Sequence, residues 1–546
     1  MIRRADHPRR LAGASTLLVL LALGVLAAVG VLAGLTGLTT PASARRDATL
    51  SGELLRTSRL LESSRYAEAA LALSELERRS ADAAEVRWLR AELLFHQGDY
   101  AGAAAKLTGL PDAALGGSVG ATRRLATSAS ELTKDFLETR SAGGHFLIRH
   151  APGADEAIAE LAGEVLDAAW RAIGDDLGLR PGDPIRVELL GSPSDLARLS
   201  PLTEAEIETT GTIALSKYNK LMVVSPRATV LGYPWMDTLA HEYTHLLVSR
   251  LSGDSVPVWL QEGLARFQQT RWRAPPELML SASERLLLTN ALKRRRLIGL
   301  EEMHPSMAKL PSQEAAALAY AQVYTLISFI HDKVGYQGLR DILAAQATGR
   351  SARRAVADAF GVPWSELDKR WQRQLRSLDL STPRLVKARQ IRFGKGGKNS
   401  DNIGLEQVAA RSRKHARLGG MLRSRNLVAA AVVEYEKALA LSPQDPYVTG
   451  KLARTLVELG RHERAIELAT PLAHLDETDP VPAVTLGIAN AARKQWSAAA
   501  AAFEQALRTS PFDPTTRCGL AEVYRELADP RLEREKRACA RLRASP

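Results

Sequence analysis

The chain has 546 residues and a mass of 59.2 kDa, enough for several domains that each bury a core. Hydrophobic residues make up 45% and charged residues 25%, which excludes a disordered chain and a membrane protein with many spans. The net charge is +12, but residues 384–425 alone hold twelve basic residues against two acidic ones. The only two cysteines, Cys518 and Cys539, exclude a disulfide-rich scaffold and a cysteine-based zinc module.

The pattern of the N-terminal residues 1–44 indicates a targeting segment. Four arginines precede a charge-free apolar run, Leu11–Leu38, which is followed by Ala42-Ser43-Ala44. The run is longer than the apolar region of a signal peptide (about 7–15 residues) and favours a transmembrane signal-anchor, whereas the small residues after it favour cleavage, so both alternatives stay open. The basic residues before the run place the folded part outside the cytoplasm. We expect a single-pass protein of the cell membrane, or a secreted or periplasmic protein if the signal is cleaved, and no nucleic-acid partner.

Two parts of the chain contain internal repeats. The pattern of residues 66–70 returns at residues 100–104, a spacing of 34, and Asp445-Pro446 returns 68 residues later as Asp513-Pro514. These segments resemble tetratricopeptide (TPR) repeats, helix pairs that bury their apolar faces only when stacked on a neighbour. The resemblance predicts all-α TPR repeats over about residues 50–112 and 413–546, and it implies protein partners.

Between the repeats the pattern predicts a small sheet and then helices. The segments 145–149, 185–189, 212–215 and 221–224 read as strands, and apolar residues recur at helical spacing over 158–173. From Asp237 nearly to Leu380 the pattern is helical. Residues 381–412 have glycines and little apolar periodicity, which predicts a solvated basic linker. The segment 394–400 lacks the spacing of a phosphate-binding loop.

A motif with metal-binding chemistry, His241-Glu242-Tyr243-Thr244-His245, lies in the helix predicted over residues 235–251. At 3.6 residues per turn His241 and His245 share one helix face, so their imidazoles can bind one metal ion while Glu242 reaches water beside it. A third protein ligand is needed. Glu262 follows on a second predicted helix, which doubles back after a break and can bring its carboxylate to the metal.

This motif, followed by Trp259-x-x-Glu262-Gly263, resembles the gluzincin zinc metallopeptidases, specifically the peptidase MA-like group, over about residues 143–380. The resemblance implies an α+β zincin-like catalytic domain with a small sheet, an HExxH helix and a helical lobe. It implies Zn²⁺ held by His241, His245 and Glu262. Glu242 would be the general base that takes a proton from the attacking water.

The resemblance also implies groups around the metal. An oxyanion donor is needed, and Tyr320 and Tyr324 are the candidates, with ordinary core aromatics as the alternative. The strand nearest the active helix, residues 212–215, would bind peptide by β-addition. Arg266 stands where thermolysin-like enzymes have an Asp that orients a ligand, and Asp237 is a candidate substitute.

The remaining histidines and the cysteines have weaker signals. No partner at ligand spacing accompanies four histidines, which we interpret as structural or surface residues: His145, His150, His304 and His331. Cys518 and Cys539 lie symmetrically about Asp529-Pro530, so in an antiparallel helical hairpin they face each other as a disulfide or as two buried thiols.

These features predict a zinc-dependent metallopeptidase that hydrolyses protein or peptide substrates in the cell envelope, with TPR repeats for protein partners and an N-terminal helix for the membrane. The alternative is a non-catalytic zinc-binding TPR scaffold of the envelope. Glu242 favours chemistry, because the resemblance gives it no ligand role. A third hypothesis, a membrane-surface or polyanion-binding module over residues 384–425, explains only the charge.

Overall fold

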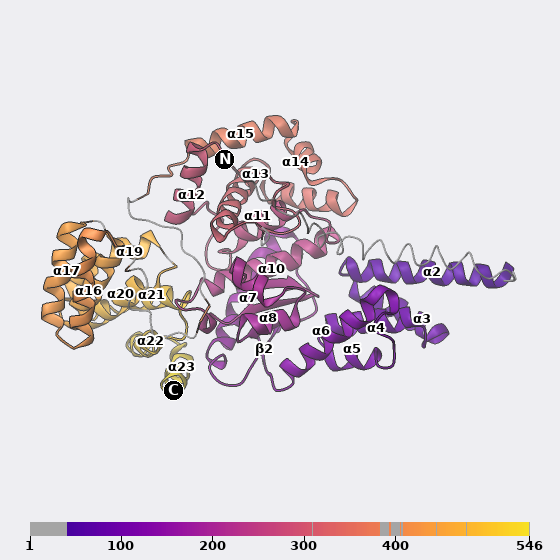
Figure 1. Ribbon diagram of the computed structural model, residues 1–546, viewed down its shortest axis with the longest axis horizontal. Coiled ribbons are helices and arrows are strands. Elements are labelled where there is room, and N and C mark those ends of the chain that lie inside the picture. The colour runs from indigo at the N-terminus through magenta and orange to yellow at the C-terminus, as the bar shows by residue number, and fades with distance from the viewer. Residues whose placement is uncertain are drawn as a thin grey trace, which may run out of the picture. The chain divides into compact units, whose positions relative to one another are not determined.

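The computed structural model describes residues 41–307, 310–382, 393–394, 405, 408–443, 445–476 and 478–544 (Figure 1). Residues 1–40 of the predicted anchor or signal segment and most of the predicted linker therefore lie outside the described residues. Within the described ranges, no helix combines the length and the hydropathy that crossing a bilayer requires. The chain forms two compact units, residues 1–131 and 132–546.

The first unit is helical. Its elements are α2 (Pro41–Glu62), α3 (Tyr66–Ser80), α4 (Ala84–Gln97), α5 (Tyr100–Lys106), a 3₁₀ turn η2 (Ala114–Gly117) and α6 (Ser118–Thr133), which ends just past the unit boundary. Leu73, Leu89 and Leu93 are buried in its core. The turn before the second repeat copy is formed by Gly98, whose φ is 82°, and by Asp99, which accepts a hydrogen bond from the Gly102 amide at 2.8 Å.

The second unit begins with a five-stranded mixed sheet in the order β1-β2-β3-β5-β4. The strands are β1 (Leu137–Arg140), β2 (Phe146–His150), β3 (Ile185–Leu190), β4 (Ala214–Lys217) and β5 (Lys220–Val224). The three central strands are parallel and both edge strands are antiparallel. The sequence did not predict β1, because its residues are mostly exposed and give no apolar alternation. At the other edge, Tyr218 and Asn219 have positive φ and form the two-residue hairpin turn between β4 and β5.

Helices pack on this sheet and then form a helical lobe that shares its core. Helix α7 (Glu156–Leu177) packs against β1 and β2, and α10 (Trp235–Ser252) packs against β4 and β5. Two short helices, α8 (Pro193–Leu199) and α9 (Glu204–Thr210), connect β3 to β4. The lobe consists of α11 (Val258–Gln268), α12 (Ala282–Lys293), α13 (Gln313–Ala347), α14 (Ala352–Phe360) and α15 (Trp364–Ser377).

The C-terminal part is a series of stacked helix pairs. They are α16 (Ala410–Ser424), α17 (Val428–Leu441), α18 (Pro446–Glu458), α19 (His462–Leu475), α20 (Pro480–Ala492), α21 (Trp496–Leu507), α22 (Pro514–Glu526) and α23 (Leu532–Ala544). Asp445, Asp479 and Asp513 are N-caps that accept backbone hydrogen bonds, and each is followed by a proline at the first helical position. The 34-residue period is therefore the distance along the chain from one Asp-Pro helix cap to the next.

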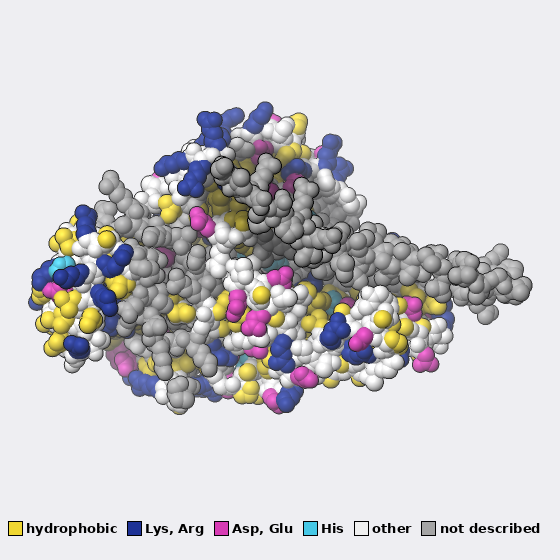
Figure 2. All heavy atoms as spheres, in the orientation of Figure 1, with side chains coloured by type: hydrophobic (Ala, Val, Ile, Leu, Met, Phe, Trp, Pro, Cys, Tyr) yellow, Lys and Arg dark blue, Asp and Glu magenta, His cyan; other side chains and the backbone are white. Residues whose placement is uncertain are grey.

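The basic stretch does not belong to the linker alone. Its second half, residues 411–424, lies in α16, which begins at Ala410 inside the predicted linker, and Arg425 is the C-cap of this helix. Exposed Leu418 and Met421 share the surface of this helix with its arginines, and Figure 2 shows Lys and Arg side chains gathered around α16 and α17.

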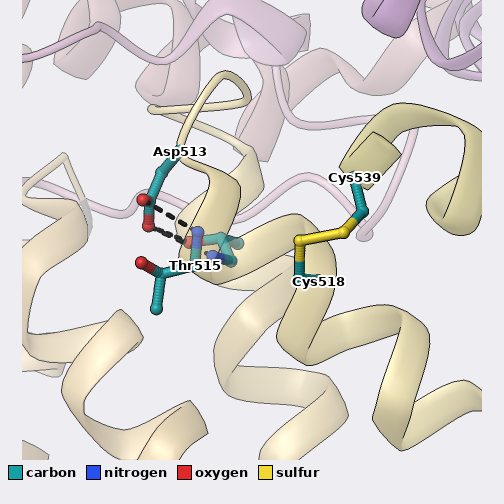
Figure 3. The surroundings of a disulfide bond; sticks show 5 residues. Asp513, Thr515, Cys518 and Cys539 are labelled. Atoms are coloured by element: carbon teal, nitrogen blue, oxygen red, sulfur yellow. Dashed lines mark hydrogen bonds between the residues drawn. A yellow bond between two sulfur atoms is a disulfide. The ribbon is translucent and has the colours of Figure 1, made fainter. Parts of the chain in front are cut away.

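A disulfide joins the last two helices. Cys518 on α22 and Cys539 on α23 are bonded, with their Cα atoms 4.9 Å apart (Figure 3). Of the two arrangements expected for these cysteines, the structure has the disulfide. The bond lies close to Asp513, which caps α22 through the amides of Thr515 and Thr516.

Candidate metal centre

Helix α10 presents His241 and His245 together. Leu239, Tyr243 and Leu246 are buried in the core on the opposite side of the helix, so the two histidines lie on its remaining face, one turn apart. Their Nε2 atoms are 3.1 Å from each other. The side chains are only 14% and 12% exposed.

Glu262 reaches the same point from α11. Gly253, with φ 60°, ends α10, and Gln261 donates a hydrogen bond back to Ser249 of α10 at 3.1 Å, which ties the two helices together. The Oε2 atom of Glu262 lies 3.4 Å from Nε2 of His241 and 3.3 Å from Nε2 of His245.

The three atoms form a triangle of the size that a metal ion needs. Ligands about 2.0–2.1 Å from a tetrahedral zinc ion stand roughly 3.3 Å from one another. Oε2 of Glu262 is buried and has no hydrogen-bond partner, which is costly for a carboxylate oxygen unless a cation binds it. Two imidazoles and one carboxylate are also a donor set of catalytic zinc sites. The residues present therefore fit a zinc ion.

The charges in the site point the same way. Burial lowers the pKa of His241. Burial also disfavours a charged His245, but the Glu262 carboxylate more than offsets this and raises the pKa of His245 to about 9. Burial likewise disfavours charge on Glu262, yet the two histidines hold its pKa far below the ordinary value. The site is thus built around a carboxylate that attracts positive charge.

Glu242 lies between the histidines and the sheet. Its side chain is buried, its Oε2 has no hydrogen-bond partner, and the backbone amide of Ser216 on β4 hydrogen-bonds the carboxylate. Burial raises the pKa of Glu242 to about 7. Potential ligand atoms of His241, Glu242 and His245 all lie within 4.8 Å of one another. The sheet therefore holds the Glu242 carboxylate through the Ser216 amide. Its Oε2 atom lies near the two histidines and has no hydrogen-bond partner.

The two candidate tyrosines have different surroundings. The ring of Tyr320 lies 6.4 Å from the His241 ring, and burial together with Glu262, which its hydroxyl reaches, raises its pKa well above the ordinary value. The Tyr324 hydroxyl instead donates to the carbonyl of Glu277 at 2.6 Å and accepts from the amide of Met279 at 2.9 Å. The geometry places Tyr320 at the site and gives Tyr324 a structural contact.

Asp237 is not the substitute carboxylate that the sequence suggested. Its oxygens accept hydrogen bonds from Trp272 Nε1 at 2.8 Å and from the Arg273 guanidinium at 3.0–3.1 Å. Asp237 shares a helix face with His241, but its carboxylate is taken up by Trp272 and Arg273 instead of a ligand histidine. Arg266, which stands where the thermolysin-like pattern has an Asp, pairs with Glu284 of α12 at 2.9 Å.

The edge strand beside the site begins later than expected, at Ala214, and extends to Lys217. The Val224 amide donates to the Ile213 carbonyl, so the alternation of an antiparallel pair turns the backbone groups of Ala214 and Ser216 away from β5. The Ser216 amide is the one that holds Glu242. Sequence reasoning missed Ser216, since no pattern in the chain links this strand position to the motif.

The four lone histidines lie outside this cluster. The His145 ring stacks on Trp170 with centroids 3.7 Å apart, and His331 packs against Phe267. His150 is buried beside the Ala151 carbonyl.

Family models match three parts of the chain. Residues 167–377 match the Peptidase MA superfamily, and residues 55–115 and 422–483 each match a tetratricopeptide repeat family. The predicted resemblance is therefore confirmed: a peptidase MA-like domain lies between two TPR segments. No curated protein matches the chain.

Solved structures show only distant likeness. MamA is 23% identical, with a TM-score of 0.21, over 23% of this chain and 71% of its own. Native yeast LTA4 hydrolase is 9% identical, with a TM-score of 0.30, over 75% of this chain and 67% of its own. The APC/C hetero-tetramer Cut9-Hcn1 is 12% identical, with a TM-score of 0.25, over 90% of this chain and 79% of its own. Likenesses this weak support no inference about activity.

Proposed function

We propose that this chain, with its Peptidase MA superfamily domain between two TPR segments, is a zinc-dependent peptidase that hydrolyses peptide bonds in protein or peptide substrates. The observation that carries the proposal is the convergence of His241, His245 and Glu262 at 3.1–3.4 Å around one point. A merely structural zinc site closes its fourth position with a protein ligand, whereas this set leaves one position for water or substrate.

The surrounding residues supply the remaining steps of hydrolysis. A zinc ion bound there would act as a Lewis acid that polarises the scissile carbonyl and makes water a better nucleophile. Glu242, oriented by the Ser216 amide, would take the proton of the attacking water and deliver it to the leaving amine. Tyr320 would donate a hydrogen bond to the negative charge that develops on the carbonyl oxygen.

The edge strand gives a way to hold the substrate. The backbone groups of Ala214 and the carbonyl of Ser216 turn away from β5 and can pair with an extended peptide, which would then lie as an added strand beside Glu242. Main-chain pairing reads few side chains, so we expect recognition of extended or unfolded segments rather than of one short sequence.

We place this activity in the cell envelope. The apolar run over residues 11–38 would deliver the folded part across the membrane, and the Cys518–Cys539 disulfide suits an oxidising compartment. The TPR segments would bring protein partners to the enzyme.

Metal content and peptide cleavage test the proposal together. The chain from Arg45 onward should contain one zinc ion by elemental mass spectrometry and should cleave members of a peptide library. Glu242→Gln should abolish cleavage, and the exposed repeat residue Glu526 changed to Gln should leave it unchanged. Zinc without cleavage would favour the non-catalytic scaffold. A folded chain that takes up no zinc after reconstitution would refute both hypotheses.

A further inference from the structure

Helix α10 begins at a contact with the C-terminal repeats. Trp235, its first residue, is fully buried, and its indole Nε1 donates to the carbonyl oxygen of Leu507 at 2.9 Å. Leu507 is the last residue of α21. The last four carbonyls of a helix have no partner within the helix, so Trp235 satisfies one of them from the peptidase domain.

The residues before Trp235 fit the same repeat backbone. The amide of Tyr233 donates to the carbonyl of Thr509 at 3.2 Å. Gly232 has φ 71°, and a Cβ atom at this position would lie 2.1 Å from the Thr509 carbonyl oxygen. The segment that leads into α10 is therefore shaped to the end of α21, and only glycine allows this approach.

The two last helices of the repeats also dock on α7. Three arginines of α23 pair, in reverse order, with three glutamates one turn apart on α7: Arg534 with Glu164, Arg537 with Glu160 and Arg541 with Glu156. This order requires the helices to run antiparallel. The disulfide between Cys518 and Cys539 ties α23 to α22 next to this contact.

A buried ion pair lies under these surface pairs. Arg517 and Glu535 are both fully buried, 2.8 Å apart, and Arg517 also donates to the carbonyl of Ala157 on α7 at 3.1 Å. A buried charge that loses its partner is strongly destabilising, so this arrangement favours one docked geometry over others.

The interface is continuous with the core of the peptidase domain. Trp235 and Tyr243 of α10 belong to the same buried apolar cluster as Phe503, Leu520 and Tyr524 of the repeats. Flexible arms are joined to a domain by small polar contacts, whereas this contact resembles the interior of one domain.

We propose that the last C-terminal repeats are a fixed support of the peptidase domain, and that Trp235 is the positioning residue through which α21 sets the N-terminal end of α10. His241 follows Trp235 by six residues, about 9 Å along the helix, so a shift of this end moves the metal ligands directly. The catalytic consequence rests on the proposed function, whereas the support of α10 does not.

Hydrogen exchange in the full chain tests the support of α10 separately from its catalytic consequence. Trp235→Phe keeps an aromatic ring, though a smaller one, and leaves the Leu507 carbonyl unpaired, so exchange in residues 235–245 should rise about tenfold. The zinc dissociation constant should rise, and kcat should fall with KM nearly unchanged. Trp88→Phe is the matched control, because it removes an indole hydrogen bond to Thr122 in the other unit.

Unchanged exchange and zinc affinity in Trp235→Phe, relative to the parent and to Trp88→Phe, would overturn the proposal. If the parent binds no zinc, the proposed function fails while the exchange result still decides the support of α10.

A charge-reversal cycle covers the case in which Trp235→Phe does not fold. Arg537→Glu and Glu160→Arg each place like charges across an exposed pair and should each speed exchange in α23 and in the first turns of α10 several-fold. The double variant should restore the parent rates. Faster exchange confined to α23 in the single variants would show that the repeats do not support α10.

Discussion

A Cβ atom on Gly263 would lie 2.5 Å from Cγ1 of Ile327 and 3.1 Å from the carbonyl oxygen of Val323. Helices α11 and α13 therefore cross at a distance that only glycine permits. Gly263 directly follows Glu262, so this crossing also sets where the third candidate ligand lies. The Glu-Gly pair in the sequence thus has a packing reason as well as a chemical one.

Gly263→Ala should push α11 away from α13. Overpacking of this kind costs about 1–3 kcal/mol, and the displaced Glu262 should raise the zinc dissociation constant about tenfold or more. Thermal unfolding and competition with a zinc chelator measure the two effects. Gly182→Ala is the control, since nothing lies within 4 Å of a Cβ there. Equal zinc affinity in the two variants would contradict this role of the crossing.

Measurements of metal content should distinguish the roles of the two glutamates of the site. Glu262→Gln should lose more zinc affinity than the roughly 10–100-fold that removal of an outer hydrogen-bond partner costs. Glu242→Gln should keep the zinc and lower kcat/KM by about 10²–10⁴-fold. Elemental analysis after dialysis, with peptide hydrolysis in parallel, checks both. Loss of zinc in Glu242→Gln would make it a ligand rather than the general base.

Substitutions of the two tyrosines should affect different properties, catalysis for Tyr320 and stability for Tyr324. Tyr320→Phe should lower kcat by about 10²–10³-fold, the usual cost of one oxyanion donor, with little change in melting temperature. Tyr324→Phe leaves the Glu277 carbonyl and the Met279 amide without their partner, so it should cost about 1–3 kcal/mol of stability with kcat retained. Steady-state kinetics and urea unfolding of both variants test this, and the reverse assignment would refute it.

The ion pair between Glu284 and Arg266 should make the domain sensitive to acid. Burial disfavours charge on Glu284, but Arg266 and the Ser281 amide outweigh it and hold the pKa of Glu284 below its usual value of 4.5. A lowered folded-state pKa gives stability that is present above the unfolded pKa and is lost as the pH falls through the folded one. Unfolding free energy should therefore fall below about pH 4.5 more steeply in the parent than in Glu284→Gln, as urea titrations would show. Equal slopes would show that this pair does not contribute.

The disulfide should stabilise the last helix pair. Its cysteines are 21 residues apart, and a loop of that length corresponds to about 3 kcal/mol in the chain-entropy account. The double variant with Cys518 and Cys539 changed to Ser should unfold at lower urea concentration than the parent, by about that free energy. Intact mass under non-reducing conditions should show the loss of two hydrogens in the parent. A parent with two free thiols and the same unfolding midpoint as the double variant would contradict the bond.

The sequence alone predicted the features that depend on short spacings. Two histidines four residues apart share a face of any α-helix, so the spacing of His241 and His245 is enough to predict them as a pair. The 34-residue repeat is predictable for the same kind of reason, because an aspartate followed by proline begins a helix through its own backbone contacts. The family models confirm both the peptidase MA-like domain and the repeats.

Only the tertiary structure decided which residues meet. Asp237 is close to His241 along the chain but pairs with Arg273, whereas Ser216, on a different element, holds Glu242. Trp235 and Leu507 are 272 residues apart and share one buried hydrogen bond. Helix and turn geometry follow from neighbours in the chain, but contacts between elements follow from how whole faces pack, and a spacing in sequence carries no measure of that packing.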